Sequence, residues 1–259
     1  MTGDELVERL TAEPESSGLF LDFDGTLAPI VEDPTLSEMP DELAPVLADL
    51  ADSLRLLAVV SGRPADFLAD RAAIPGARLL GLYGLQEWTD GSIRPRPEAE
   101  QWQGAVDTAL DRVETALEGE EGIRVEDKGL SVAVHWRNAE DRQRAERKVE
   151  RLIGSIADDT GLAREPGKLV SELRPPVDWD KGTAVRTLAD ELGLRTVVYV
   201  GDDRGDLAAF EAVRERDGVA VAVDHGEETP AELVDAADVV LDGTDAVADW
   251  LVSLRDALG

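Results

Sequence analysis

The chain has 259 residues, of which 43% are hydrophobic, so it can bury the core of one large α/β domain or of two smaller ones. Its 56 acidic and 26 basic residues give a formal net charge of −30, and only four of the basic residues are lysines. This charge argues against a broad basic face, so we expect neither a nucleic acid nor an anionic membrane as a partner.

Six short apolar runs rich in β-branched residues recur along the chain, each followed by turn residues. They lie at 19–22, 56–62, 77–84, 196–203, 218–223 and 238–242. Stretches with helical spacing separate them, for example 40–52, 181–193 and 205–216. This alternation predicts an α/β fold with a doubly wound, Rossmann-like parallel sheet, in which ligands bind beyond the carboxyl ends of the strands.

The middle of the chain follows a different pattern. Residues 97–119 have helical spacing, and two alternating segments around Lys128 suggest a hairpin. A charged helical stretch at 138–159 and an extended segment at 168–175 follow. We therefore expect a smaller α/β unit, inserted into a larger core. The expected boundaries are 1–90 and 175–259 for the core and 91–174 for the insertion.

Two acidic strand ends are the first candidates for chemistry. Asp22 and Asp24 follow the first apolar run, and along a strand their spacing would place both carboxylates on one face. A polar turn would explain either one alone, but two carboxylates on one face repel each other unless a cation or a shared proton relieves them. Asp202, Asp203 and Asp206 follow another run. Together the two ends could hold one hard cation such as Mg²⁺.

Three further residues stand where a phosphate could bind. Ser61 and Gly62 end an apolar run just before a helical segment, where a hydroxyl and backbone N–H groups favour anions. Serine is also a common helix N-cap, which is the alternative explanation. Lys181 opens a helical stretch, where a cation is unfavourable against the helix dipole unless an anion lies nearby. A solvated surface lysine is the alternative at that position.

Four segments resemble, in chain order, the four motifs of phosphatases in the haloacid dehalogenase superfamily. They read LDFDGTL, VVSGR, DKGTAV and VGDDRGDLAAF. The insertion resembles the α/β cap of the sugar-phosphatase branch. Within that branch, EDKGLSVAVHWR and GKLVSELRP are similar to segments of trehalose-6-phosphate phosphatases.

The resemblance implies a role for each motif residue. Asp22 would be the nucleophile that takes the phosphoryl group, and Asp24 would be the general acid and then the general base. Asp22, the backbone carbonyl of Asp24, and Asp202 would hold Mg²⁺. Ser61 and Lys181 would bind phosphoryl oxygens.

Other residues would support these groups or bind the substrate. Asp206 would orient Lys181 or a metal-bound water, and Gly62 and Arg63 would contribute to substrate binding. The insertion would hold the sugar hydroxyls, whose recognition needs paired donors and acceptors. Its candidates are Lys128, His135, Arg137, Lys168, Glu172 and Arg174. For each of these the alternative is a solvated sheet face, although the spacing of His135 and Arg137 would place them on one face of a strand.

The expected reaction is the hydrolysis of trehalose 6-phosphate to trehalose and phosphate. Two alternatives stay open: a phosphatase for another sugar phosphate of the same branch (sucrose, mannosylglycerate or glucosylglycerol phosphate), and a phosphate-binding regulatory module without turnover. Two positions depart from the family pattern. Tyr83 stands where histidine is frequent, and Gly205 and Leu207 flank Asp206 where threonine and glutamate are frequent.

Composition also predicts the surroundings of the protein. A surface this acidic and poor in lysine is typical of adaptation to concentrated salt, whereas an ordinary acidic cytosolic protein would rarely reach −30 at this length. The absence of cysteine excludes disulfides and thiolate metal sites. The first residues lack the pattern of a secretion signal, and no apolar run reaches the length of about 18 residues that spans a membrane. We therefore expect a soluble, cytoplasmic and halophilic protein, and a monomer is compatible with the sequence.

Overall fold

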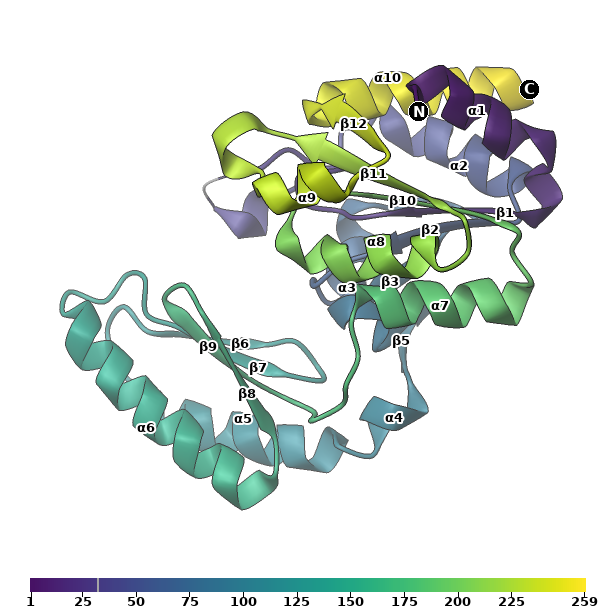
Figure 1. Ribbon diagram of the computed structural model, residues 1–259. Helices are drawn as coiled ribbons and strands as arrows, with labels where there is room; N and C mark the ends of the chain where they lie inside the picture. The colour runs from purple at the N-terminus through teal and green to yellow at the C-terminus, as the bar shows by residue number, and fades with distance from the viewer. Residues whose placement is uncertain (32) are drawn as a thin grey trace. The chain divides into compact units, whose positions relative to one another are not determined.

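The computed structural model describes residues 1–31 and 33–259, and the chain divides into two compact units (Figure 1). The larger unit comprises Met1–Arg94 and Trp179–Gly259, and the smaller unit comprises Pro95–Asp178. The joints lie a few residues beyond the boundaries expected from the sequence.

The larger unit is built on an eight-stranded sheet in the order β12-β11-β10-β1-β2-β3-β4-β5. Its strands are β1 (Ser17–Leu21), β2 (Leu56–Val60), β3 (Arg78–Gly81), β4 (Gln86–Thr89), β5 (Ser92–Pro95), β10 (Thr196–Gly201), β11 (Val219–Asp224) and β12 (Val239–Asp242). The strands from β12 to β3 are parallel, and β4 runs antiparallel to β3. The six predicted runs form the parallel part, which confirms the predicted α/β fold with a doubly wound sheet. The sequence did not predict β4 and β5.

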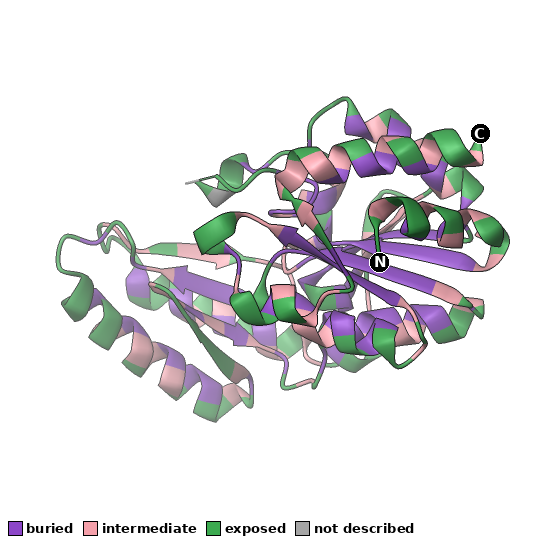
Figure 2. Ribbon diagram, turned by 45° about the horizontal axis from the view of Figure 1, so that its top comes forward, coloured by how far each residue is buried: buried purple, intermediate pink, exposed green. Residues whose placement is uncertain are grey.

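Helices cover both faces of this sheet. They are α1 (Gly3–Ala12), α2 (Leu43–Ser53), α3 (Ala65–Arg71), α7 (Lys181–Leu192), α8 (Leu207–Arg214), α9 (Ala231–Ala236) and α10 (Gly243–Leu258). Alternation along each strand divides the core in two: Leu19 and Leu21 of β1 pack with α1, α2, α3 and α10, whereas Phe20 packs with α7, α8 and α9. Figure 2 shows the strands buried and the outer faces of the helices exposed.

Short 3₁₀ helices occupy several of the connections. They are η1 (Pro14–Ser16), η2 (Pro34–Leu36), η3 (Leu82–Gly84), η4 (Arg204–Asp206) and η5 (Gly226–Glu228). None of the helices in the described parts of the chain is both long and apolar enough to cross a membrane.

The strand order brings two acidic strand ends together. From β1 the chain continues to β2 and β3 on one side, and it later forms β10, β11 and β12 on the other side. The order therefore reverses beside β1, and such a switch point is where open α/β sheets bind ligands. Leu21 of β1 is in register with Val200 of β10. Asp22 and Asp202 consequently leave the sheet at the same carboxyl edge.

The smaller unit has a four-stranded antiparallel sheet in the order β6-β7-β9-β8. Its elements are α4 (Pro97–Glu100), α5 (Gln103–Leu117), β6 (Arg124–Asp127), β7 (Val132–His135), α6 (Arg142–Thr160), β8 (Ala163–Gly167) and β9 (Val170–Arg174). Val132, Val134 and Leu173 of the sheet pack against α5 and α6. The structure confirms the predicted β6–β7 hairpin, whereas residues 97–119 form two helices rather than one. The sequence did not predict β8.

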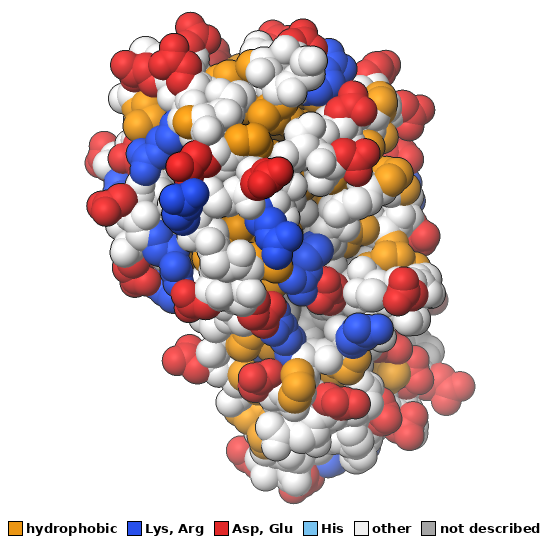
Figure 3. Space-filling view, turned by 90° about the vertical axis from the view of Figure 1, so that its right-hand side faces the viewer, with side chains coloured by type: hydrophobic (Ala, Val, Ile, Leu, Met, Phe, Trp, Pro, Cys, Tyr) orange, Lys and Arg blue, Asp and Glu red, His pale blue; other side chains and the backbone are white. Residues whose placement is uncertain are grey.

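The acidic surface leads to a prediction about salt. Acidic side chains are spread over the whole face shown in Figure 3, with Lys and Arg side chains among them. Mobile ions screen the repulsion among these charges, so we expect the melting temperature to rise from about 0.1 M to about 2 M KCl. A rise of roughly 2–4 °C would correspond to each kcal/mol of repulsion removed.

The same titration near pH 5 is the control for this prediction. Carboxylates begin to take up protons there, so the repulsion and its dependence on salt should both be smaller. A flat or falling curve at neutral pH would mean that the composition is that of an ordinary acidic protein.

Candidate active site

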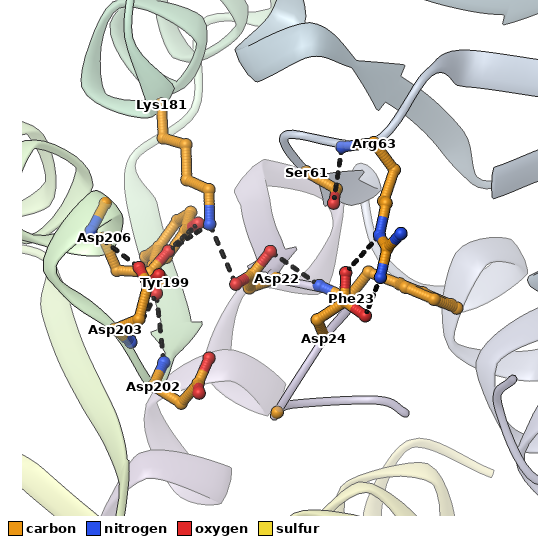
Figure 4. Close-up of polar contacts among 12 residues, drawn as sticks. Asp22, Phe23, Asp24, Ser61, Arg63, Lys181, Tyr199, Asp202, Asp203 and Asp206 are labelled. Atoms are coloured by element: carbon orange, nitrogen blue, oxygen red, sulfur yellow. Dashed lines mark hydrogen bonds and ion pairs between the residues drawn. The ribbon is translucent and has the colours of Figure 1, made fainter. Parts of the chain in front are cut away.

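Asp22 and Asp24 lie beyond the end of β1. The strand ends at Leu21, so the expectation that both carboxylates share one face of a strand was wrong. The chain leaves extended geometry at this point, and the two side chains diverge. In Figure 4 the Asp22 carboxylate turns toward Lys181, and the Asp24 carboxylate turns toward Arg63.

The Asp22 carboxylate is buried and paired. Its side chain is 7% exposed, and its Oδ2 lies 2.8 Å from Nζ of Lys181. Its Oδ1 accepts a 2.7 Å hydrogen bond from the backbone N–H of Phe23, and its own N–H donates to the carbonyl of Val200 on β10. Burial raises the pKa of Asp22 well above its usual value, although the charge of Lys181 lowers it.

Lys181 is the first residue of α7, which begins there because the Asp180 carboxylate caps it by accepting the N–H of Thr183. The Lys181 side chain is only 4% exposed, and its Nζ also lies 2.7 Å from Oδ1 of Asp206. Burial alone would lower the pKa of Lys181, but the anions Asp206 and Asp22 outweigh burial and raise it. This lysine is therefore a fixed buried cation, which the alternative of a solvated surface lysine does not allow.

Four donors saturate the carboxylate of Asp206. Oδ1 accepts from Nζ of Lys181 at 2.7 Å and from the hydroxyl of Tyr199 at 2.6 Å. Oδ2 accepts from the backbone N–H groups of Asp202 and Asp203, each at 3.0 Å. Asp206 thus holds Lys181 and the turn after β10 in one arrangement. Tyr199 was not predicted from the sequence, although a phenol inside an apolar strand was a signal that it needs a buried partner.

The described residues contain one group of acids suited to a cation. One carboxylate oxygen from each of Asp22, Asp202 and Asp206 lies within 4.8 Å of the others. Burial and the nearby charges of Asp206 and Asp203 raise the pKa of Asp202 to about 7, the direction expected for a buried carboxylate among other acids. Asp206 is already saturated, so Asp22 and Asp202 have the capacity to bind Mg²⁺. An all-oxygen set of this kind fits a hard cation.

Asp24 forms a two-point ion pair with Arg63. Its oxygens lie 2.7 Å from Nε and 2.9 Å from Nη2, and the guanidinium lies over the ring of Phe67 at 4.7 Å. Burial alone would raise the pKa of Asp24, but the hydrogen bonds and charge of Arg63 lower it overall. Asp24 is therefore a carboxylate here whose side chain is occupied by Arg63, and the role of its backbone carbonyl as a metal ligand stays a prediction from the family resemblance.

The remaining core candidates lie in the loop after β2. Ser61 is buried, and its Oγ accepts the backbone N–H of Arg63 at 3.2 Å. The ring of Tyr83 lies against Gly62, where a Cβ would come within 3.0 Å of it. Leu82 and Tyr83 have φ values of 48° and 62°, which is strained backbone for residues other than glycine. The strained turn is held by the Tyr83 N–H, which donates to the carbonyl of Ser61.

The structure brings together some of the candidates in the smaller unit. Lys128 Nζ lies 2.8 Å from Oε2 of Glu172, and both side chains are largely buried. His135 Nε2 lies 2.7 Å from Oε2 of Glu126, and this hydrogen bond lowers the pKa of Glu126 to about 2. The sequence did not predict Glu126, which neighbours His135 only across the β6–β7 hairpin.

The other three candidates in this unit pair with a different residue or are exposed. Arg174 pairs with Glu165 of β8 at 3.5 Å. Arg137 and Lys168 are exposed in turns. Because β7 ends at His135, the expectation that His135 and Arg137 share one face of a strand was wrong.

His225 is a second residue near the core site that the sequence did not predict. It follows β11, and its Nε2 lies 2.7 Å from the carbonyl oxygen of Gly25. Its position directly after an apolar run was the available signal, because such positions gather at the carboxyl edge of the sheet.

Comparison with known families places this site in context. Residues 20–239 match the model of the trehalose-phosphatase family. The chain belongs to this family. This confirms the predicted resemblance, and the core motifs described above lie within the matched residues.

Relatives of the family differ from the chain in length. The trehalose-phosphate phosphatase of Mycobacterium avium is 34% identical over 253 residues, which cover 93% of this chain and 62% of that protein. A Mycobacterium tuberculosis protein described as an uncharacterized glycosyl hydrolase is 36% identical over 220 residues, which cover 81% of this chain and 16% of that protein. The chain thus spans less than two thirds of the length of these relatives.

Solved structures share the fold. A trehalose-6-phosphate phosphatase related protein has a TM-score of 0.75 and 26% identity, and the match covers 92% of this chain and 97% of that chain. The C-terminal domain of the Candida albicans trehalose-6-phosphate phosphatase has a TM-score of 0.68 at 21% identity, covering 97% and 96%. A haloacid dehalogenase-like hydrolase from Bacteroides thetaiotaomicron has a TM-score of 0.57 at 18% identity, covering 91% and 98%. The last two matches support the fold alone.

Proposed function

We propose that this chain is a Mg²⁺-dependent phosphatase that hydrolyses trehalose 6-phosphate to trehalose and phosphate through an aspartyl phosphate. The observation that carries the proposal is the buried pair of Asp22 and Lys181 beside Asp202, in a member of the trehalose-phosphatase family. The Asp22 carboxylate is removed from water and held in place by Lys181. When a phosphoryl group also binds Lys181, its phosphorus atom would lie close to this carboxylate, which could then attack it.

In the first step an Asp22 carboxylate oxygen attacks the phosphorus atom, and the bond from phosphorus to the sugar oxygen breaks. The leaving sugar oxygen takes a proton from Asp24. Lys181 and the Ser61 hydroxyl bind the other phosphoryl oxygens, and Asp206 keeps Lys181 in position. Mg²⁺ bound by Asp22, Asp202 and the Asp24 backbone carbonyl would neutralise charge on the transferring group.

In the second step a water molecule attacks the phosphorus atom of the aspartyl phosphate. The Asp24 carboxylate takes the proton of this water, the bond from phosphorus to the Asp22 oxygen breaks, and inorganic phosphate leaves. The products are trehalose and phosphate, and both aspartates end the cycle ready for another turnover.

Arg63 links substrate binding to the protonation of Asp24. In the free protein Arg63 stabilises Asp24 as the carboxylate. The second step uses this form as a base, whereas the first step needs the protonated form. A bound phosphate competes for the guanidinium, because Arg binds phosphate at two points as it binds carboxylate. Once Arg63 is drawn to the substrate, Asp24 loses its counter-ion and takes a proton from solvent, which it then gives to the leaving oxygen.

The smaller unit supplies recognition of the sugar in this proposal. Lys128, in the turn after β6, and Glu172 of β9 form a largely buried donor and acceptor pair, the chemistry that polyol hydroxyls require. His135, Arg137, Lys168 and Arg174 are the further candidates. The choice of trehalose 6-phosphate rests on the family and on these polar groups.

Removal of the metal tests the proposal. We expect EDTA to stop phosphate release and added Mg²⁺ to restore it. Asp202→Ala removes a carboxylate that has capacity for the ion, so the Mg²⁺ concentration for half-maximal activity should rise by roughly 100-fold. Asp235→Ala removes an exposed carboxylate elsewhere and is the matched control. Full activity of the wild-type protein after thorough chelation would contradict a mechanism that depends on Mg²⁺.

A further inference from the structure

A hydrogen bond joins the loop after β1 to the end of β11. His225 Nε2 lies 2.7 Å from the carbonyl oxygen of Gly25, although the two residues are 200 positions apart in the chain. A carbonyl oxygen can only accept, so the ring nitrogen in this contact carries the proton. β11 and β1 are not adjacent, because β10 lies between them. The contact therefore ties together the carboxyl ends of strands on both sides of β10.

Gly25 is the point at which this loop touches Asp202. Its φ of +73° is the left-handed conformation that glycine adopts without strain. A Cβ at this position would lie 2.1 Å from Oδ2 of Asp202, so the carboxylate packs directly on the glycine backbone. The Gly25 N–H donates to the carbonyl of Ala28 at 2.8 Å. With its carbonyl on His225, both polar groups of Gly25 are fixed.

His225 is itself held in place. Its backbone N–H donates to Oγ1 of Thr229 at 2.7 Å, and the Thr229 hydroxyl lies 3.3 Å from the carbonyl of Val223 on β11. Thr229 is buried and His225 is half-buried. These contacts fix the backbone of His225, from which the half-buried imidazole reaches the Gly25 carbonyl.

We propose that His225 is a positioning residue for the cation site. By holding the Gly25 carbonyl, it fixes the Gly25–Thr26 peptide, one unit beyond the Asp24 carbonyl, and the glycine backbone on which the Asp202 carboxylate rests. Without this bond, the flexible glycine would let the Asp24–Gly25 segment move. The cation would then have to order this segment when it binds, and the lost conformational entropy would weaken its affinity. The inference rests on the proposed function, since it assigns His225 to the Mg²⁺ site formed by Asp22, Asp202 and the Asp24 carbonyl.

Three substitutions at His225 separate a positioning role from a packing role. His225→Ala removes the donor. His225→Gln places an amide N–H the same number of bonds from the backbone as Nε2, whereas the side chain of His225→Asn is one bond shorter. Glu228→Ala, at an exposed position in the neighbouring η5 turn, is the control. Melting temperatures of all variants show whether each one is folded.

The primary measurement is calorimetric titration of each protein with Mg²⁺ in the absence of substrate. We expect the dissociation constant for Mg²⁺ to rise about 10-fold or more in the Ala and Asn variants and to stay within about 3-fold of wild type in the Gln and Glu228→Ala variants. If His225 acts through the cation site alone, KM for the sugar phosphate at saturating Mg²⁺ should be unchanged in the Ala variant. If His225→Ala does not fold, the contrast between Gln and Asn decides.

Two results would overturn the inference in distinguishable ways. Equal Mg²⁺ affinity in the wild-type, Ala and Asn proteins would show that His225 does not position the site, while the proposed function would stand. A wild-type protein that binds no Mg²⁺ would instead reject the metal site of the proposed function, and the inference with it.

Discussion

Asp22→Asn is expected to reduce phosphate release by about 10⁴-fold or more, the scale of loss when a nucleophile is removed. An amide cannot take over the attack on phosphorus that the carboxylate makes. The fold should survive, because burial disfavours the ionised form of Asp22 and raises its pKa, and because Lys181 keeps Asp206 as its counter-ion after the substitution. At neutral pH the neutral asparagine removes that cost, so we expect the melting temperature to stay at or above the wild-type value.

Asp235→Asn neutralises an exposed aspartate and is the matched control, for which we expect wild-type activity. Phosphate release and circular dichroism on the same preparations provide the comparison. A folded Asp22→Asn protein that keeps a few per cent of wild-type turnover would contradict the covalent mechanism.

Lys181→Met is expected to lower the free energy of unfolding by about 3–5 kcal/mol at neutral pH, the cost of breaking a buried ion pair. Methionine fills similar volume but leaves the carboxylates of Asp22 and Asp206 without their common cation. Activity should be lost as well, since Lys181 would bind the transferring group. Urea unfolding at pH 7 measures the first effect, and phosphate release measures the second.

The pH dependence of this variant gives an internal check. Burial already raises the pKa of Asp22, and the substitution removes the charge that lowers it. An acid whose pKa is raised in the folded state destabilises the fold fully above that pKa. This penalty declines as the pH falls toward the unfolded-state pKa and is absent below it. The deficit of Lys181→Met relative to wild type should therefore shrink as the pH falls from 8 toward 5.

Lys148→Met is the matched control for this prediction. Lys148 pairs with Glu120 at 2.7 Å on the surface, where both side chains are more than a third exposed. Such pairs contribute about 0–1 kcal/mol, so the loss should be small and nearly independent of pH. Similar losses for Lys148→Met and Lys181→Met would contradict the account of Lys181 as a buried cation.

Local pattern was enough to predict where the site lies. The apolar runs that became β1 and β10 are buried on both faces, and parallel strands place their carboxyl ends at one edge. Asp22 and Asp202 therefore had to approach each other once the order reversed beside β1. By contrast, β4, β5 and β8 are short and mix polar with apolar residues. They therefore show neither a continuous apolar run nor the two-residue hydrophobic alternation that predicts a strand.

The partners of each carboxylate could not be predicted, because they come from distant parts of the chain. The strand β1 would have to continue for three more residues, from Leu21 to Asp24, for Asp22 and Asp24 to share a face, and strand ends are the least certain part of any pattern. Asp24 meets Arg63 and Asp206 meets Tyr199 only through tertiary packing. His225 reaches Gly25 across a neighbouring strand, which no spacing in the sequence encodes.

The most direct test of the proposed function is phosphate release by the purified protein, with saturating Mg²⁺, from trehalose 6-phosphate, glucose 6-phosphate, sucrose 6-phosphate and p-nitrophenyl phosphate. All four carry the same reacting group, so differences in kcat/KM report contacts with the rest of the substrate. We expect kcat/KM for trehalose 6-phosphate to exceed that for glucose 6-phosphate by about 10²-fold, which corresponds to two to three kcal/mol of transition-state binding. Equal kcat/KM values for these two sugars, or no release from trehalose 6-phosphate, would contradict the proposed function.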